Sequence, residues 1–197
     1  MAYLYPLIAV IIWAGNAVVN KLSAGVIDPA TISFYRWLLA RLLLTPFVFK
    51  GVICHRKTIY PYLMKLLVLG VLGMALSQSL AYYAAYSISA LTIGIMISVI
   101  PLLTILLSLV ILQIPPTIGV LLGSIVSFIG LIWLISGGQP MKLLEIGVGK
   151  GEIMMFIATL SYALYGVLTK KWSLQIANWH SVYFQIIFGT LTLLPFF

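Results

Sequence analysis

Two arginines lie inside a stretch of otherwise apolar sequence. Arg36 and Arg41 fall within residues 31–49, a run long enough for one transmembrane helix. A charged side chain at membrane depth costs at least a few kcal/mol, so it is by default a hypothesis about function. Arg36 is about one turn from the end of the run, so substrate contact and snorkelling to the interface remain equal alternatives. Arg41 is near the middle, and we expect it to face a polar cavity or a cluster of carbonyl groups.

Uncharged polar side chains recur at helical spacing in two other apolar runs. Gln78 and Tyr82 are four residues apart, and Trp13 and Asn16 are three apart, so each pair shares one face of a helix. Hydrogen bonding between helices would explain them, and so would a cavity for a small zwitterion. We expect Asn16, Gln78 and Tyr82 to converge on one cavity, with Arg36 or Arg41 supplying positive potential.

No acidic residue lies in the middle of any apolar run. The three acids are Asp28, Glu145 and Glu152, all in turns, connections or at a helix start. A pump for lipophilic cations would need a buried carboxylate, whereas a buried arginine suits a carboxylate-bearing substrate such as an amino acid. His55 and His180 are isolated in sequence, so we predict no metal site, no cofactor and no catalytic residues.

The composition indicates that lipid surrounds the chain. It is 63% hydrophobic and 7% charged, whereas soluble domains carry roughly 25% charged residues. We therefore predict an all-α integral membrane protein with seven transmembrane helices. The predicted spans are residues 3–19, 31–49, 66–86, 91–112, 117–136, 153–169 and 179–197. Pro101 interrupts the fourth span and is a candidate hinge or cavity-lining kink.

The positive charges predict an orientation rather than a nucleic-acid partner. Eleven Lys and Arg against three acids give a net charge of +8, but these residues sit at the ends of apolar runs. The connection at residues 50–65 is the most basic, and it lies on the same side as the N-terminus. We therefore expect a cell (inner) membrane protein with a cytoplasmic N-terminus. Its expected partners are the bilayer and a small-molecule substrate, and a homo-oligomer stays open.

The first part of the sequence repeats near its end. Residues 1–48 match residues 150–197 at a fixed offset, with Lys21 aligned to Lys170 and Trp13 aligned to Tyr162. The predicted domains are a first five-helix repeat at residues 1–136, a connection at 137–152, and the first two helices of a truncated second repeat at 153–197. Because five is odd, the second repeat would be inverted, and the intact protein would have ten helices.

Short motifs are spread in order along the chain. They are Trp13-Ala14-Gly15-Asn16, Asp28-Pro29, Phe34-Tyr35-Arg36, Tyr82-Tyr83-Ala84, Ile100-Pro101-Leu102-Leu103-Thr104 and Ser161-Tyr162-Ala163. In these motifs the sequence resembles the drug/metabolite transporter superfamily, in its EamA-like branch of ten helices. The resemblance implies two inverted halves around a cavity that moves small metabolites, often outward. It also implies that the helices carrying Trp13, Asn16, Arg36, Gln78, Tyr82 and Pro101 border that cavity.

The predicted function is secondary transport, as an exporter, of a small polar metabolite such as an amino acid. A non-transporting membrane subunit and a component of a lipid-linked-sugar flippase are alternatives from another class. A seven-helix receptor is a less favoured alternative. A receptor of the retinal type requires a lysine in the middle of its seventh helix, and residues 179–197 contain none. An enzyme is the least favoured class, because the sequence lacks a catalytic constellation.

Overall fold

The computed structural model describes residues 4–135, 138 and 149–196, and their regular structure is helical. Most of the predicted connection at residues 137–152 lies outside these residues, including Glu145. The first span is α1 (Leu4–Ser23) and the second is α2 (Pro29–Cys54). The third is a continuous series of α3 (Arg56–Ile59), η1 (Tyr60–Tyr62), α4 (Leu63–Gly70), η2 (Val71–Leu76) and α5 (Ser77–Ala84).

The remaining spans complete the helical fold. They are α6 (Ala90–Ser98) with α7 (Ile100–Ile111), then α8 (Ile118–Ile135), α9 (Lys150–Trp172), and α10 (Asn178–Leu193) with η4 (Leu194–Phe196). Each predicted span therefore coincides with helix, which confirms the all-α class. Four described segments are long and apolar enough to cross a membrane: Pro29–Cys54, Arg56–Ala84, Ala90–Ile111 and Lys150–Trp172. The stretch Ile118–Gly130 of α8 is also apolar but shorter.

The local sequence explains why α2 begins at Pro29. The helix extends beyond residue 49, where we predicted that the span would end. The Asp28 carboxylate accepts hydrogen bonds from the backbone N–H groups of Ala30 at 2.9 Å and Thr31 at 3.2 Å, and Pro29 occupies the first turn, where its missing N–H costs nothing. We expected residues 50–65 to form a connection, whereas they are mostly helical. Lysine and arginine are good helix formers, so a basic stretch need not interrupt a helix.

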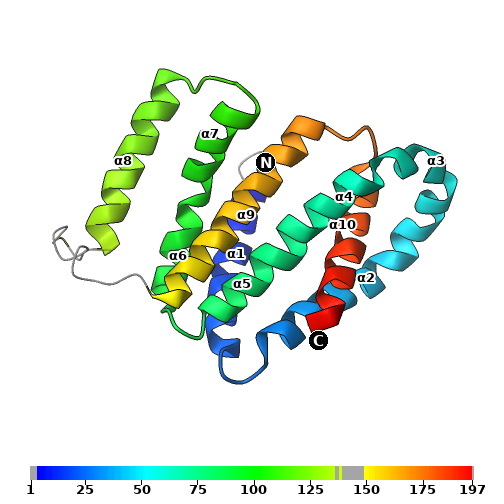
Figure 1. Cartoon of the computed structure of the whole chain (residues 1–197), viewed down its shortest axis with the longest axis horizontal. Helices are drawn as coiled ribbons and strands as arrows, with labels where there is room; N and C mark the ends of the chain where they lie inside the picture. The colour runs from blue at the N-terminus through cyan, green and yellow to red at the C-terminus, as the bar shows by residue number, and fades with distance from the viewer. Residues whose placement is uncertain (1–3, 136–137, 139–148, 197) are drawn as a thin grey trace.

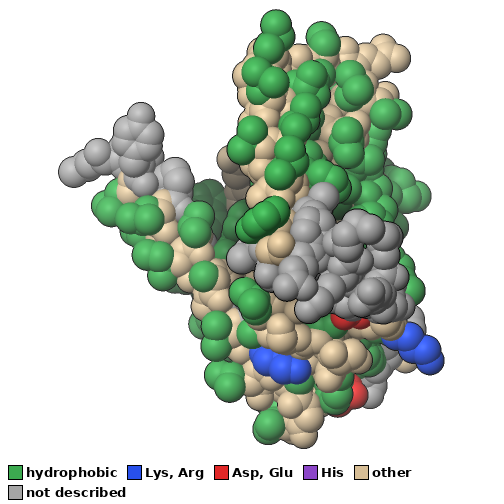
Figure 2. Space-filling view, turned by 90° about the vertical axis from the view of Figure 1, so that its left-hand side faces the viewer, with side chains coloured by type: hydrophobic (Ala, Val, Ile, Leu, Met, Phe, Trp, Pro, Cys, Tyr) green, Lys and Arg blue, Asp and Glu red, His purple; other side chains and the backbone are tan. Residues whose placement is uncertain are grey.

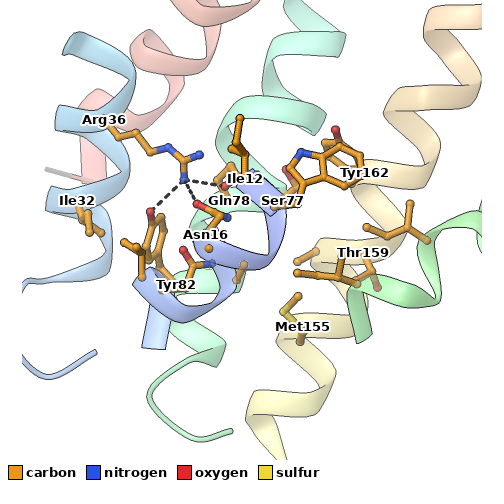
Figure 3. A pocket seen from close by; sticks show the side chains of 18 residues that line it. Ile12, Asn16, Ile32, Arg36, Ser77, Gln78, Tyr82, Met155, Thr159 and Tyr162 are labelled. Atoms are coloured by element: carbon orange, nitrogen blue, oxygen red, sulfur yellow. Dashed lines mark hydrogen bonds between the residues drawn. The ribbon is translucent and has the colours of Figure 1, made fainter. Parts of the chain in front are cut away.

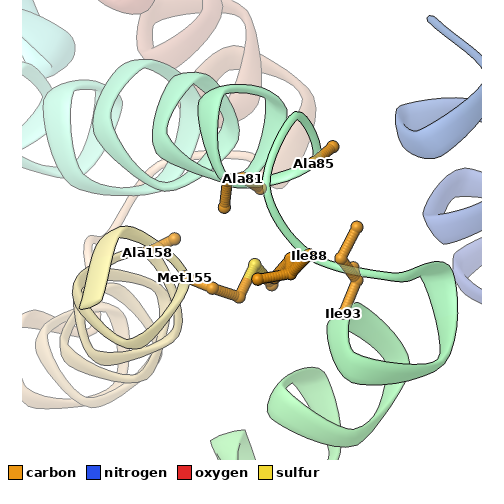
Figure 4. Close-up of a cluster of buried hydrophobic side chains, with 7 residues drawn as sticks. Ala81, Ala85, Ile88, Ile93, Met155 and Ala158 are labelled. Atoms are coloured by element: carbon orange, nitrogen blue, oxygen red, sulfur yellow. The ribbon is translucent and has the colours of Figure 1, made fainter. Parts of the chain in front are cut away.

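The helices α5 and α9 pack closely against each other. Small side chains let these helices approach closely, and a Cβ added at Gly151 would lie 2.8 Å from side-chain atoms of both Ser87 and Ile88. The buried cluster at this contact contains Ala81, Ala84, Ala85, Ile88, Ile93, Met155 and Ala158 (Figure 4). Van der Waals packing of small residues is the main source of helix association in lipid.

The face of the molecule in Figure 2 carries many apolar side chains, and many large apolar residues are exposed along the helices. Val110 on α7 is 74% exposed, and Ile118 on α8 is 78% exposed. In Figure 1, α7 and α8 form a hairpin beside the bundle, while α10 lies between α2 and α4. Contiguous apolar surface of this kind is costly in water and favourable in a bilayer, so it supports membrane embedding.

Candidate functional site

A cavity of about 630 Å³ opens between the first three spans, the kinked fourth span and α9. Its wall is mostly apolar, and no acidic side chain is among the described residues that line it. The lining side chains include Ile12, Trp13, Asn16, Asn20, Ile32, Arg36, Ser77, Gln78, Tyr82, Ile97, Ile100, Met155, Thr159 and Tyr162 (Figure 3). An apolar cavity with a few convergent polar groups is the usual form of a small-molecule site.

Arg36 is the centre of the polar groups in this cavity. Its Nη1 donates hydrogen bonds to Asn16 Oδ1 at 2.9 Å, to Tyr82 OH at 3.0 Å and to Gln78 Oε1 at 3.2 Å (Figure 3). The guanidinium Cζ also lies 5.4 Å from the centre of the Trp37 ring, within the range of a cation–π contact. Residues from α1, α2 and α5 are thus held together by one side chain, which we call the Arg36 cluster: Asn16, Arg36, Gln78 and Tyr82.

Five of the seven residues singled out in the sequence line this cavity, and two do not. Trp13 joins the Arg36 cluster in its wall. Arg41 is half-buried on α2 but does not line the cavity, because five residues along an α-helix correspond to about 500°, which turns it roughly 140° away from Arg36. Pro101 is exposed. The break that we predicted there is present, since α6 ends at Ser98 and α7 begins at Ile100.

A π-helical segment, which the hydropathy pattern did not reveal, precedes the cavity residues of the third span. In η2, residues Val71–Leu76 form a π-helix, in which the backbone hydrogen bonds join residues five apart, and Ser77 and Gln78 follow directly. The indole Nε1 of Trp37 donates a hydrogen bond to the Met74 carbonyl at 2.8 Å. Gly73 faces Tyr165 of α9 so closely that an added Cβ would lie 2.7 Å from the ring. Single-turn π segments are frequent at functional sites.

The residues of α9 that line the cavity were not predicted from the sequence. They are Met155, Ala158, Thr159 and Tyr162, at the three- and four-residue spacing of one helix face. Tyr162 meets Trp13 edge to face, with ring centroids 6.1 Å apart and an interplanar angle of 88°. The alignment of these two residues in the sequence repeat was the available signal that they belong together.

Other polar residues near the site have structural roles. The Lys21 ammonium donates to the Ala85 carbonyl at 2.8 Å and so caps the carbonyl end of α5, where a cation also suits the helix dipole. His55 and His180, which are distant in sequence, lie side by side with ring centroids 5.6 Å apart. Within the described ranges, no three His, Cys, Asp or Glu residues are grouped as a metal site would require.

Comparisons with known proteins relate the chain to a family of transporters. Residues 1–136 match the model of the EamA-like transporter family. An uncharacterized transporter of Archaeoglobus fulgidus is 28% identical over 194 residues, covering 96% of this chain and 64% of that protein. The uncharacterized transporter YyaM of Bacillus subtilis is 24% identical over 178 residues, covering 88% and 57%. The chain thus spans less than two thirds of the length of these relatives. No solved structure gives a significant match.

Proposed function

The chain belongs to the EamA-like transporter family, and from this membership and its cavity we propose that it moves a small polar metabolite across the cell membrane. The proposed substrate carries a carboxylate, as an amino acid does, and the proposed direction is export. The Arg36 cluster is the observation that carries this proposal. It joins three helices at one point in an apolar cavity, where a substrate that binds can change how the helices pack.

An inverted repeat would give this cavity two alternating openings, and two observations support it. Trp13 and Tyr162 are aligned by the sequence repeat, and their rings also meet edge to face with centroids 6.1 Å apart. Two positions related by a two-fold axis can touch only if both lie near that axis. In Figure 1, α9 runs opposite to α1 and α10 runs opposite to α2. Rocking of one repeat against the other around such an axis is the usual route to alternating access.

Flux measurements on the full-length protein test the transport function. Proteoliposomes would be loaded with a mixture of radiolabelled amino acids, and efflux would be followed with and without an ion gradient. We expect Gln78→Ala and Tyr82→Phe each to reduce efflux at least about fivefold, because each loses a hydrogen bond to a charged group. Tyr60→Phe is the matched control, since Tyr60 is 76% exposed and lies outside the cavity. Unchanged flux in both cavity variants would remove these residues from the site.

Thiol labelling tests the proposed orientation. Cys54 is exposed at the end of α2, next to the basic stretch that we place in the cytoplasm. In a protein whose only cysteine is Cys54, we expect an impermeant maleimide to label inside-out vesicles and to leave intact cells unlabelled. Cys54→Ser supplies the background signal. Labelling of intact cells would reverse the orientation.

A further inference from the structure

The Arg36 cluster has an unequal distribution of donors and acceptors. Asn16 and Gln78 both turn their amide oxygens toward Arg36 Nη1, and Tyr82 turns its hydroxyl oxygen to the same atom. A guanidinium only donates hydrogen bonds, so an amide NH₂ group in the same place would oppose another donor. The arginine therefore determines which end of each amide faces it, and this orientation follows from chemistry alone.

What remains in the cluster is a set of donors. The Asn16 Nδ2 and Gln78 Nε2 groups carry two N–H bonds each, the Tyr82 hydroxyl keeps its proton, and Arg36 keeps its Nη2 and Nε donors. Across the described residues, the only hydrogen bonds that involve these side chains are the three that Arg36 Nη1 donates. Two neighbouring hydroxyls add no competing donors, because Ser77 donates to the Gly73 carbonyl and Thr159 to the Phe156 carbonyl.

We propose that the Arg36 cluster is an anion receptor in which Arg36 orients Asn16 and Gln78 so that their NH₂ groups, with the Tyr82 hydroxyl, bind the carboxylate of the substrate. The inference rests on the proposed function and assigns a role to each residue. Arg36 supplies the positive potential and the orientation, whereas the amides and the phenol supply directed hydrogen bonds. A carboxylate has about four lone-pair sites, which matches several donors converging from different helices.

The charge of the cavity also favours an anionic ligand. Arg36 is half-buried, and no acidic side chain is found among the described lining residues. A partly buried positive charge without a counter-ion is less well stabilised than one in water, and a bound carboxylate would offset that cost. A cationic ligand would increase it. The cavity therefore selects against amines that lack an acidic group.

Three probes with the same carbon skeleton separate these possibilities. Isovalerate is an anion, isovaleramide is neutral and isoamylamine is a cation, and all three have a similar apolar part. Isothermal titration calorimetry of the full-length protein in nanodiscs would measure each affinity. We expect isovalerate to bind at least about tenfold more tightly than isovaleramide, because charge-assisted hydrogen bonds are the stronger ones, and isoamylamine to bind most weakly. Equal affinities, or a preference for the amine, would overturn the proposal.

Substitutions test the role of amide orientation. Gln78→Glu replaces the NH₂ group by a second acceptor and adds a negative charge, so isovalerate affinity should fall by more than about tenfold. Gln78→Met keeps the shape and removes the donor, and it should cause a smaller loss of the same sign. Gln175→Glu is the matched control, because Gln175 is exposed in the turn between α9 and α10. Wild-type isovalerate affinity in both Gln78 variants would contradict the inference.

Arg36→Lys separates the charge from the orientation. Lysine keeps the positive charge, but it replaces the planar guanidinium, whose Nη1 meets all three acceptors, by a rotatable ammonium on a stem of different shape. The amides should then be oriented less well, so affinity for isovalerate should still fall at least about tenfold, with the preference over isovaleramide reduced. An unchanged affinity would show that charge alone suffices and would overturn the orienting role. The binding assay is independent of flux. If the protein binds isovalerate but transports nothing, the proposed function is wrong and this inference stands. If it transports a substrate but shows no preference for anions, this inference is wrong and the proposed function stands.

Discussion

Two cavities of similar size border α2, and they differ in chemistry. The first, about 630 Å³ in volume, contains the Arg36 cluster. The second, about 540 Å³, is lined by Leu44, Phe47, Val48, Ala177, Trp179 and His180. Apolar side chains dominate the second cavity, and the ring of its histidine lies 5.6 Å from that of His55. The comparison shows that volume alone does not identify a site, since only the first cavity brings polar groups from several helices to one point.

The difference originates in the neighbours of α2. At Arg36, α2 lies beside α1 and α5, which both carry polar side chains on the facing side. Near Leu44 and Val48, its neighbour is α10, whose first turn offers aromatic rings. One helix thus forms an electropositive wall at one level and an apolar wall at another. A gap in packing near lipid needs no ligand, because acyl chains can fill it.

The largest expected effect comes from removing the charge in the first cavity. Arg36→Met should reduce transport at least about 100-fold, because three acceptors lose one charged donor and each such bond contributes about 1.5–3 kcal/mol. His180→Ala makes a change in the second cavity and should alter flux by less than about twofold. Efflux of labelled amino acids from proteoliposomes checks both. Similar losses in the two variants would mean that the cavities do not differ in function.

A smaller effect is expected from a larger side chain at Gly73, where the third span packs against α9 next to the first cavity. Gly73→Ala would place a Cβ 2.7 Å from the Tyr165 ring, and overpacking of this kind costs about 1–3 kcal/mol. Gly166→Ala on α9 is the control, since an added Cβ there meets nothing within 4 Å, and Ala is a better helix former than Gly by about 1 kcal/mol. Thermal unfolding in detergent should show opposite shifts. A lower melting temperature for the Gly166 variant would contradict this account.

The smallest effect concerns two tryptophans, one beside each cavity. Trp37→Phe removes the indole N–H that donates to the Met74 carbonyl at 2.8 Å, and the loss of a partly buried hydrogen bond of this kind costs about 0.5–1.5 kcal/mol. Trp179 is 69% exposed in the wall of the second cavity, so Trp179→Phe should change the free energy of unfolding by less than about 0.5 kcal/mol. Chemical unfolding in mixed micelles measures both, and equal changes would remove the special role of Trp37.

Hydropathy predicted the spans well because the bilayer requires long apolar helices whatever their packing. The convergence of Asn16, Gln78 and Tyr82 on Arg36 was predictable for a related reason. Polar groups at membrane depth are few, and each must find a partner, so the available pairings are limited. The part that Arg36 and its partners play in transport stays a proposal.

Features that depend on packing between distant helices were not predictable in this way. Arg41 was a candidate for the cavity because it lies near the middle of its span, but its position around α2 places it outside the lining of the cavity. Thr159 and Met155 line the cavity because α9 packs against α5, and no local pattern records that contact. The basic stretch at residues 50–65 was interpreted as a connection from its charge, although charge says little about whether a backbone is helical.

The π segment in the third span has a consequence for insertions and deletions. Backbone hydrogen bonds in a π-helix join residues i and i+5, whereas those in an α-helix join residues i and i+4. Each turn of a π-helix therefore contains about one residue more. Deleting one residue within Val71–Leu76 would let an α-helical ladder form there, while α4 still faces α10 and α5 still faces α9. The same deletion within α5 would turn every later residue by about 100°, and Tyr82 would leave the cavity. A change in length is therefore tolerable at this one turn of the span, and damaging one turn further along.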